Sequence, residues 1–194
     1  MKLYMIRHGE STANAEKKHA GWAQIPLTEK GREDAKLAGK LLHGIQFDRI
    51  WVSDLIRAKE TLSLALPDAE ATETPLLREI GVGELSGKTI AECTELYGEP
   101  YLREKVNYNF VPFGGENHEM HLDRVRRFAD TVAKDGADTV AAFCHAGSIR
   151  CMLDHVEGVF HKPKDTPVIN GSVSIFEYAD GKWSCIAWNQ TETE

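Results

Sequence analysis

The sequence contains no long hydrophobic run. Every apolar stretch is far shorter than the roughly 20 residues that a helix needs to span a bilayer. The first residues also lack the basic segment and apolar core of a secretory signal, since the run Leu3 to Ile6 is too short. We therefore expect a cytoplasmic protein with no membrane partner.

Paired cysteines are also absent. The chain has four cysteines, none of which forms a C-x-x-C pair: Cys93, Cys144, Cys151 and Cys185. Zinc ribbons and thioredoxin-like motifs are therefore not indicated, and free thiols are expected. His118 and His121 have a spacing that could hold a metal, but no H-E-x-x-H pattern or third ligand accompanies them. Solvated or loop-facing histidines are the favoured interpretation, and we expect no metal and no other cofactor.

The chain has no excess of positive charge, no low-complexity segment and no internal repeat. Its 23 basic residues are outnumbered by 30 acidic ones, and the net charge of −7 argues against a general nucleic-acid-binding surface. An apolar content of 42% and a charged content of 27% are typical of a soluble globular protein. With 194 residues and no linker, the chain is expected to form one domain, residues 1–194, as a monomer or a homodimer.

Two short apolar runs each end in a histidine that is followed closely by a glycine. The run Leu3 to Ile6 leads into Arg7 and His8, and a run from residue 140 to 144 leads into His145. In open α/β sheets, ligands bind at the carboxyl ends of such strands. An arginine there suits phosphate oxygens. A histidine can act as a nucleophile, as a proton carrier or as a further hydrogen-bond donor to phosphate. The alternatives are an ordinary solvated loop for Arg7-His8 and a buried, backbone-satisfied side chain for His145.

A third strand, residues 47–53, is followed by a helix for which Ser53-Asp54 is the expected cap. Arg57 in the first turn of this helix would lie at the same sheet edge. The alternative is that Arg57 is an exposed surface residue, as most arginines at such positions are. Two further helices and an edge strand are expected: a helix capped by Thr28 over about 28–44, a strand over 69–74, and a helix over 118–136 that ends near Gly136. A helix beginning at Ser148, over about 148–158, and a terminal hairpin over 172–188 complete the expected elements.

The middle of the chain carries two carboxylates and an aromatic-rich insertion. Glu79 and Glu84 lie in a stretch with three glycines, which predicts an irregular loop. Residues 86–115 then hold five aromatic side chains: Tyr97, Tyr101, Tyr108, Phe110 and Phe113. Such an insertion more often forms a small satellite core than a binding wall, but a lid over a site could do both.

Six blocks in one order connect these features. They are Arg7-His8-Gly9-Glu10-Ser11, Pro26-Leu27-Thr28 with Gly31, Ser53-Asp54-Leu55 with Arg57-Ala58, Leu77-Arg78-Glu79, Gly114-Gly115-Glu116, and His145-Ala146-Gly147 with Ile149-Arg150. Together they resemble the histidine phosphatase superfamily, the phosphoglycerate-mutase-like proteins, over nearly the whole chain. The resemblance implies an α/β fold, a three-layer α/β/α sandwich with a mainly parallel sheet and a small helical cap at about residues 86–115.

The resemblance also implies roles for particular residues. His8 matches the nucleophile of the family, and Glu79, not Glu84, matches its general acid and base. The implied phosphate pocket consists of Arg7, Asn14, Arg57, His145 and Ala146. Three positions depart from common patterns of the family, at Gln24, Ser86 and Asn117. None belongs to the implied catalytic set, but all could alter cap contacts and substrate choice.

The expected function is metal-independent hydrolysis of a small phosphorylated metabolite through a phosphohistidine on His8. Two arginines and a second histidine can hold phosphate oxygens without a metal. The alternative is a phosphoglycerate mutase, which the short chain and compact cap disfavour because they leave the site open to water. A non-catalytic phospho-ligand binding protein or a phosphoprotein phosphatase is a further alternative. The motifs do not distinguish nucleoside-like phosphates such as a ribazole phosphate from sugar phosphates or phosphoglycerates.

Overall fold

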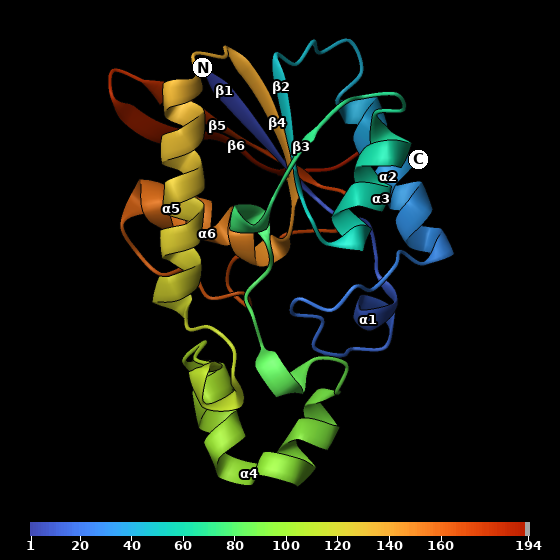
Figure 1. The fold of residues 1–194 in the computed structure, drawn as a ribbon, viewed down its shortest axis with the longest axis vertical. Helices are drawn as coiled ribbons and strands as arrows, with labels where there is room; N and C mark the ends of the chain where they lie inside the picture. The colour runs from blue at the N-terminus through green and yellow to red at the C-terminus, as the bar shows by residue number, and fades with distance from the viewer. Residues whose placement is uncertain (193–194) are drawn as a thin grey trace.

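A six-stranded mixed sheet forms the centre of the computed structural model, which describes residues 1–192 (Figure 1). The strand order is β3-β2-β4-β1-β5-β6. The strands are β1 (Lys2–Arg7), β2 (Arg49–Ser53), β3 (Thr72–Thr74), β4 (Thr139–Cys144), β5 (Val173–Ala179) and β6 (Lys182–Gln190). Strands β1, β2, β3 and β4 run parallel, whereas β5 and β6 form an antiparallel hairpin at one edge. The α/β class and the mainly parallel sheet expected from the sequence are confirmed.

Helices cover both faces of this sheet, as Figure 1 shows. They are α1 (Thr12–Ala15), α2 (Glu29–Leu41), α3 (Ile56–Ala65), α4 (Ile90–Val106), α5 (His118–Asp135) and α6 (Ala146–Glu157), with 3₁₀ turns η1 (Pro75–Leu77), η2 (Gly83–Leu85) and η3 (Val111–Phe113). Side chains alternate along β4, so Val140 and Ala142 pack with α5 and α6 while Ala141 and Phe143 pack with α2 and α3. The expected three layers are therefore present, with an apolar core on each side of the sheet.

The register of the parallel strands brings distant residues to one edge. Arg7, the last residue of β1, is paired with Cys144, the last residue of β4. The backbone N–H of His8 then donates to the carbonyl oxygen of Cys144 at 3.0 Å, so His8 and His145 leave the sheet side by side. Ser53 ends β2 on the other side of β4. The carboxyl ends of three strands thus meet where the sequence predicted a site.

Local signals in the sequence identify most helix ends. Thr28 caps α2 by accepting a hydrogen bond from the Gly31 N–H, and α5 ends at Gly136 as expected. The expected cap at Ser53-Asp54 is wrong: Leu55 precedes α3 without a side-chain cap, because Asp54 forms an ion pair with Arg78 instead. The helix expected from Ser148 begins two residues earlier, at Ala146.

Residues 86–115, which we call the cap segment, extend beyond the carboxyl edge of the sheet (Figure 1). Helix α4 bends within it, because Gly98 has a left-handed φ of 59° and Pro100 follows. The segment has its own core, in which Cys93, Tyr101, Phe110 and Phe113 are buried beside Ile80, Val82 and Leu85. The satellite-core interpretation of the aromatic residues therefore holds for this part of the molecule.

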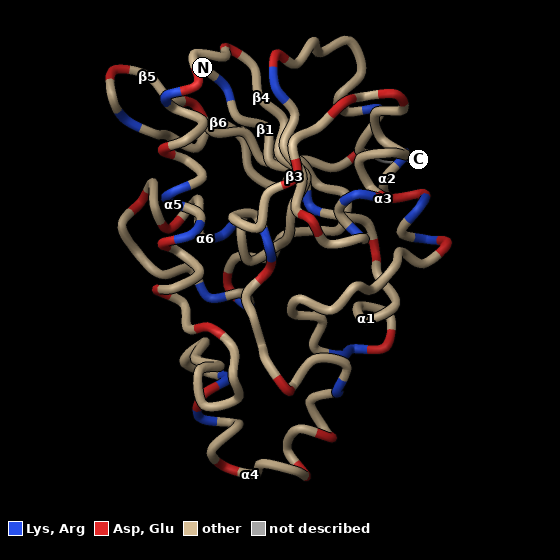
Figure 2. Tube along the Cα trace, in the orientation of Figure 1, with Lys and Arg blue, Asp and Glu red and all other residues tan. Residues whose placement is uncertain are grey.

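Charged residues are spread over the chain. In Figure 2 Lys and Arg positions are interspersed with Asp and Glu along the helices and are not gathered on one element. Within residues 1–192, no helix combines the length and apolarity that crossing a membrane would require. The cations that distinguish the carboxyl edge of the sheet are buried ones, described next.

Candidate active site

His8 and His145 face each other at the carboxyl edge of the sheet, in a cluster with Arg7, Arg57 and Glu79 that we call the pocket. Their ring centroids are 5.1 Å apart, and their exposed fractions are 4% and 0%. His8 Nδ1 lies 2.6 Å from the carbonyl oxygen of Gly9, which can only accept a hydrogen bond. Nδ1 must therefore carry the proton, and the lone pair of the neutral ring is on Nε2. His145 Nε2 lies 2.9 Å from the hydroxyl of Ser53.

The two histidines are neutral at physiological pH. Burial lowers the pKa of His8 well below its usual value, and the charges of Arg57 and Arg7 lower it further. The pKa of His145 is also well below its usual value, through burial first and then through Arg57 and His8. Burial contributes more to the neutral form of His8 than the nearby cations do.

Arg7 and Arg57 supply the positive charge of the pocket. Burial lowers the pKa of each guanidinium to about 10, so both remain charged at neutral pH. Arg57 donates to the carbonyl oxygens of Gly21 at 2.9 Å and Ala23 at 3.0 Å, and Arg7 donates to that of Val168. These backbone contacts orient both guanidinium groups but use only part of their donor capacity.

Three buried nitrogens of the pocket have no hydrogen-bond partner among the described residues: Arg7 Nε, Arg57 Nε and His145 Nδ1. Buried polar atoms are rarely left unpaired in a folded protein. Two of these atoms belong to charged guanidinium groups, and such groups match the geometry of phosphate oxygens. The pocket is therefore suited to bind an anion.

Glu79 joins this pocket through the first turn of α6. Its two carboxylate oxygens accept hydrogen bonds from the N–H groups of Ile80 at 2.9 Å and Gly147 at 3.1 Å. Only glycine fits at position 147, because a Cβ there would lie 1.9 Å from Glu79 Oε1. Burial alone would raise the pKa of Glu79, but the charges of His121 and Arg150 and the two N–H donors leave it below its usual value. Glu84 is exposed on η2 and takes no part in the pocket.

The remaining predicted residues lie at the margin of the pocket. Asn14 caps α1 with Ser11, and its Oδ1 lies 3.4 Å from Asn170 Nδ2. The same Asn170 amide donates to the carbonyl oxygen of His8 at 3.0 Å, which links Asn14 to His8. Ala146 follows His145 as the first residue of α6. The structure therefore brings all the predicted residues to one region, with Asn14 joined to His8 through another side chain.

Several residues near the pocket were not predicted. Asn170 gave no signal in the sequence, and Arg150 appeared only within a motif, without a role. His121 is wrongly predicted as solvated or loop-facing: it is only 1% exposed and lies 3.2 Å from the Ser148 hydroxyl. The reason is that the first turn of α5 packs against α6, which histidine spacing alone does not indicate.

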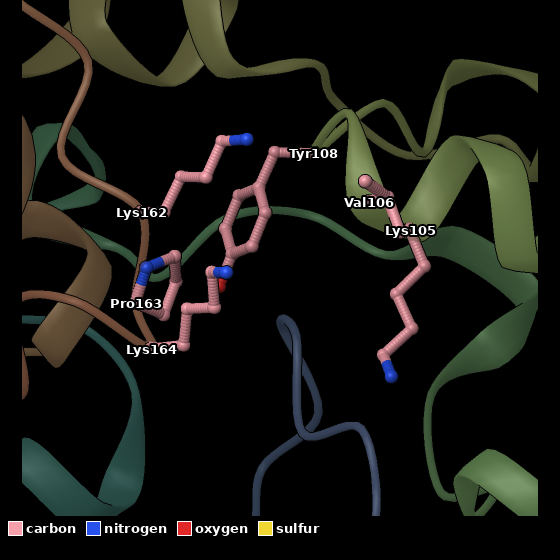
Figure 3. A pocket seen from close by; sticks show the side chains of 6 residues that line it. All are labelled: Lys105, Val106, Tyr108, Lys162, Pro163 and Lys164. Carbon is pink, nitrogen blue, oxygen red and sulfur yellow. The ribbon is translucent and has the colours of Figure 1, made fainter.

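Tyr108 differs from the other aromatic residues of the cap segment because it faces a cavity. This cavity has a volume of about 450 Å³ and is lined by Lys105, Val106, Tyr108, Lys162, Pro163 and Lys164 (Figure 3). In Figure 3 Lys162 and Lys164 lie beside the Tyr108 ring, and Lys105 lies apart from them across the cavity. Tyr108 also lines a second, small cavity together with Arg150 and Gly147, and the Gly147 N–H donates to Glu79, so Tyr108 lies near both the lysine-lined cavity and Glu79.

A buried anion pocket with two neutral histidines and a carboxylate, at the carboxyl edge of a parallel sheet, is characteristic of an enzyme site. The model of the histidine phosphatase superfamily (branch 1) matches residues 3–191, and the chain belongs to this superfamily. Members of the superfamily are phosphatases or mutases.

Some individual relatives are named as phosphatases and others as mutases. The chain is 33% identical to 2,3-bisphosphoglycerate-dependent phosphoglycerate mutase 2 of Gloeobacter violaceus, over 94% of this chain and 88% of the relative. Its structure resembles the alpha-ribazole phosphatase of Shigella flexneri, with a TM-score of 0.90, 25% identity, and coverage of 98% of this chain and 96% of the other. It also resembles a phosphoglycerate mutase of Bacillus anthracis str. Sterne, with a TM-score of 0.83, 25% identity, and coverage of 98% and 93%.

Proposed function

We propose that the protein is a phosphomonoesterase that transfers the phosphoryl group of a small metabolite to His8 Nε2 and then to water. One observation carries this proposal. The Gly9 carbonyl oxygen holds the proton on His8 Nδ1, which leaves the Nε2 lone pair free beside two guanidinium groups. A neutral imidazole with an available lone pair is the form that attacks phosphorus.

In the first step Arg7, Arg57 and His145 hold the phosphate oxygens. The N–H of Ala146, in the first turn of α6, and the side chain of Asn14 complete the proposed pocket. The Nε2–P bond forms as the P–O bond to the leaving group breaks, and the leaving oxygen takes a proton from Glu79. The charge of the transferred group is balanced by guanidinium groups, so the proposed step needs no metal.

The proton on Glu79 is coupled to substrate binding. In the free protein the pKa of Glu79 is below its usual value, so the side chain is a carboxylate at neutral pH. A phosphate dianion bound beside it would raise that pKa and favour the protonated acid. In the second step the Glu79 carboxylate takes a proton from water, the water oxygen attacks phosphorus, and the P–N bond breaks to restore His8.

A phosphoglycerate mutase is the second candidate. It is favoured by the names of the relatives and by the three lysines around the 450 Å³ cavity, which could hold a second anionic group of a substrate. Hydrolysis is preferred because the cap segment is compact, which would let water reach the phosphohistidine. In the same proposal, residues 1–194 form one domain with residues 86–115 as its cap.

Rapid quenching into base tests the mechanism, because an N-linked phosphohistidine is acid-labile. Mixing the protein with a labelled substrate should place label on His8, and His8→Ala should remove both the label and nearly all turnover. Following free phosphate and isomerised ester in the same reaction distinguishes a phosphatase from a mutase. Label on His145 with none on His8 would reverse the proposed roles. Activity that a chelator removes without lowering the Tm, and that added metal restores, would refute the metal-free step.

A further inference from the structure

Beside the phosphate pocket, three potential metal ligands converge from two helices. His118 is the first residue of α5, while Cys151 and Asp154 lie three residues apart on α6. One ligand atom from each of the three side chains lies within 4.8 Å of the other two. Cys151 and Asp154 are each only 2% exposed, so the cluster is not a chance grouping of surface residues.

The hydrogen bonding of Asp154 is a second observation that points to a ligand at this cluster. Its Oδ1 accepts hydrogen bonds from the backbone N–H of His161 at 2.8 Å and pairs with the ring Nδ1 of His161 at 2.7 Å. Its Oδ2 is buried and makes no hydrogen bond, although His118 Nε2 lies 3.3 Å away. An unpaired carboxylate oxygen in the protein interior is costly unless another group satisfies it.

The cluster also borders a small cavity. Its volume is about 10 Å³, on the scale of a single water-sized sphere. The lining includes His118, Cys151, Asp154 and His161, together with Phe160 and Arg150. The space beside the unpaired oxygen is therefore of the size that one small ion needs.

We propose that His118, Cys151 and Asp154 form a zinc site. Thiolate, imidazole and carboxylate are the ligands that Zn²⁺ takes in proteins, at about 2.0 to 2.3 Å from the metal. In a tetrahedron of that size neighbouring ligand atoms are roughly 3.3 to 3.8 Å apart, and His118 Nε2 and Asp154 Oδ2 are 3.3 Å apart. Solvent would complete the fourth position, because both ring nitrogens of His161 already pair with Asp154 and Glu157.

The charges balance in this site. Zn²⁺ displaces the proton of the Cys151 thiol, which passes to solvent, so one thiolate and one carboxylate offset the two positive charges. No group of the proposed phosphoryl transfer is among the ligands. The site would join α5 to α6 and, through the hydrogen bonds between Asp154 and His161, would also hold the segment that follows α6. Its role is structural, and the proposal does not depend on the proposed function.

Cobalt substitution tests the site without measuring activity. The full chain, stripped of metal with a chelator, should bind one Co²⁺ and develop a thiolate-to-cobalt charge-transfer absorption that Zn²⁺ displaces. Cys151→Ser should abolish this absorption and Cys185→Ser, a matched thiol on β6, should retain it. An absorption that persists in Cys151→Ser, or the absence of a one-to-one complex in the wild-type chain, would overturn the proposal.

Thermal unfolding gives an independent readout. At a free Zn²⁺ concentration 100 times its Kd, the Tm of the wild-type chain and of Cys185→Ser should rise by about 5 to 10 °C. His118→Gln changes a side chain that is 14% exposed and keeps the α6 ligands, so it should fold while losing most of this rise. If Zn²⁺ shifts the Tm of His118→Gln as much as that of the wild-type chain, the cluster is only a hydrogen-bonded network around Asp154.

Discussion

The proposed phosphate pocket and the cap segment depend on opposite kinds of interaction. The pocket combines buried His8, His145 and Arg57 with Arg7 and Glu79, and backbone groups from distant segments orient these side chains. The cap segment buries mainly aromatic and aliphatic side chains around Tyr101 and Phe113. Charged groups in the pocket are left with unpaired donors, which costs stability, while the aromatic core contributes stability.

This comparison indicates how the two regions should respond to substitution. Replacing a pocket residue should change the reaction more than it changes the free energy of unfolding, whereas replacing a cap core residue should do the reverse. Tyr108 is the informative exception, because it belongs to the cap segment but faces the lysine-lined cavity.

The largest expected effect is that of Glu79→Gln, which keeps the shape of the side chain but removes its proton. A positioned general acid contributes on the order of 10² to 10⁴ in rate. The first-step rate on an alkyl phosphate should fall by that factor, and the rate on p-nitrophenyl phosphate much less, because its phenolate leaves unaided. Rapid quench isolates this step. The exposed Glu84→Gln is the matched control and should spare both substrates; equal slowing of both by Glu79→Gln would mean that Glu79 only positions other groups.

Phe113→Ala tests the other half of the comparison. Removing a buried phenylalanine ring typically costs about 3 to 5 kcal/mol of unfolding free energy, and Phe113 is 7% exposed. Denaturant unfolding should show this loss, while turnover of p-nitrophenyl phosphate well below the midpoint should stay close to that of the wild-type chain. A large loss of turnover with unchanged stability would show that the cap core is part of the site.

Tyr108→Ala should separate recognition from stability. The truncation of a contact residue at a binding site costs roughly 1 to 2 kcal/mol, so KM for substrates with a large non-phosphate part should rise about 5- to 30-fold. KM for p-nitrophenyl phosphate should change little. Tyr97→Ala is the matched control, because Tyr97 packs against the cap core and Phe113. If both variants change the ranking of substrates alike, the effect comes from the fold of the cap segment.

The smallest expected effect of a single residue is the contribution of a buried histidine to the change in unfolding free energy with pH. Burial lowers the pKa of His8, His145 and His121, the last to about 4. The unfolded chain therefore binds more protons below pH 6.5, and stability falls as the pH decreases from there towards the folded-state pKa values. Between pH 7 and pH 5.5 each buried histidine should remove about 1 kcal/mol of unfolding free energy.

The cap segment has no histidine, but His19, His118 and His155 also have pKa values below their usual range through burial and add smaller contributions. Denaturant unfolding at the two pH values measures this pH dependence, and His121→Asn should reduce the difference by about 1 kcal/mol, the contribution of one buried histidine. A pH dependence that His121→Asn leaves unchanged would show that His121 is not buried in its neutral form.

Local features of the sequence were enough to predict most of the architecture. The apolar runs that become β1 and β4, Thr28 before α2, and Gly136 after α5 act through neighbouring backbone, so their effect is visible in a short window. The pairing of Arg7-His8 with His145 was predictable as well, because parallel strands end at a common edge.

Side-chain partners across the fold could not be predicted in this way. Asp54 pairs with Arg78 when it could have capped α3, and His118 lies beside Cys151 and Asp154 and not beside a ligand of its own helix. Asn170 reaches His8 across 162 positions of the chain. Short-range propensities determined where helices and strands form. Only tertiary packing decided which polar side chains meet, because the direction of a side chain depends on how its own element is oriented against distant neighbours.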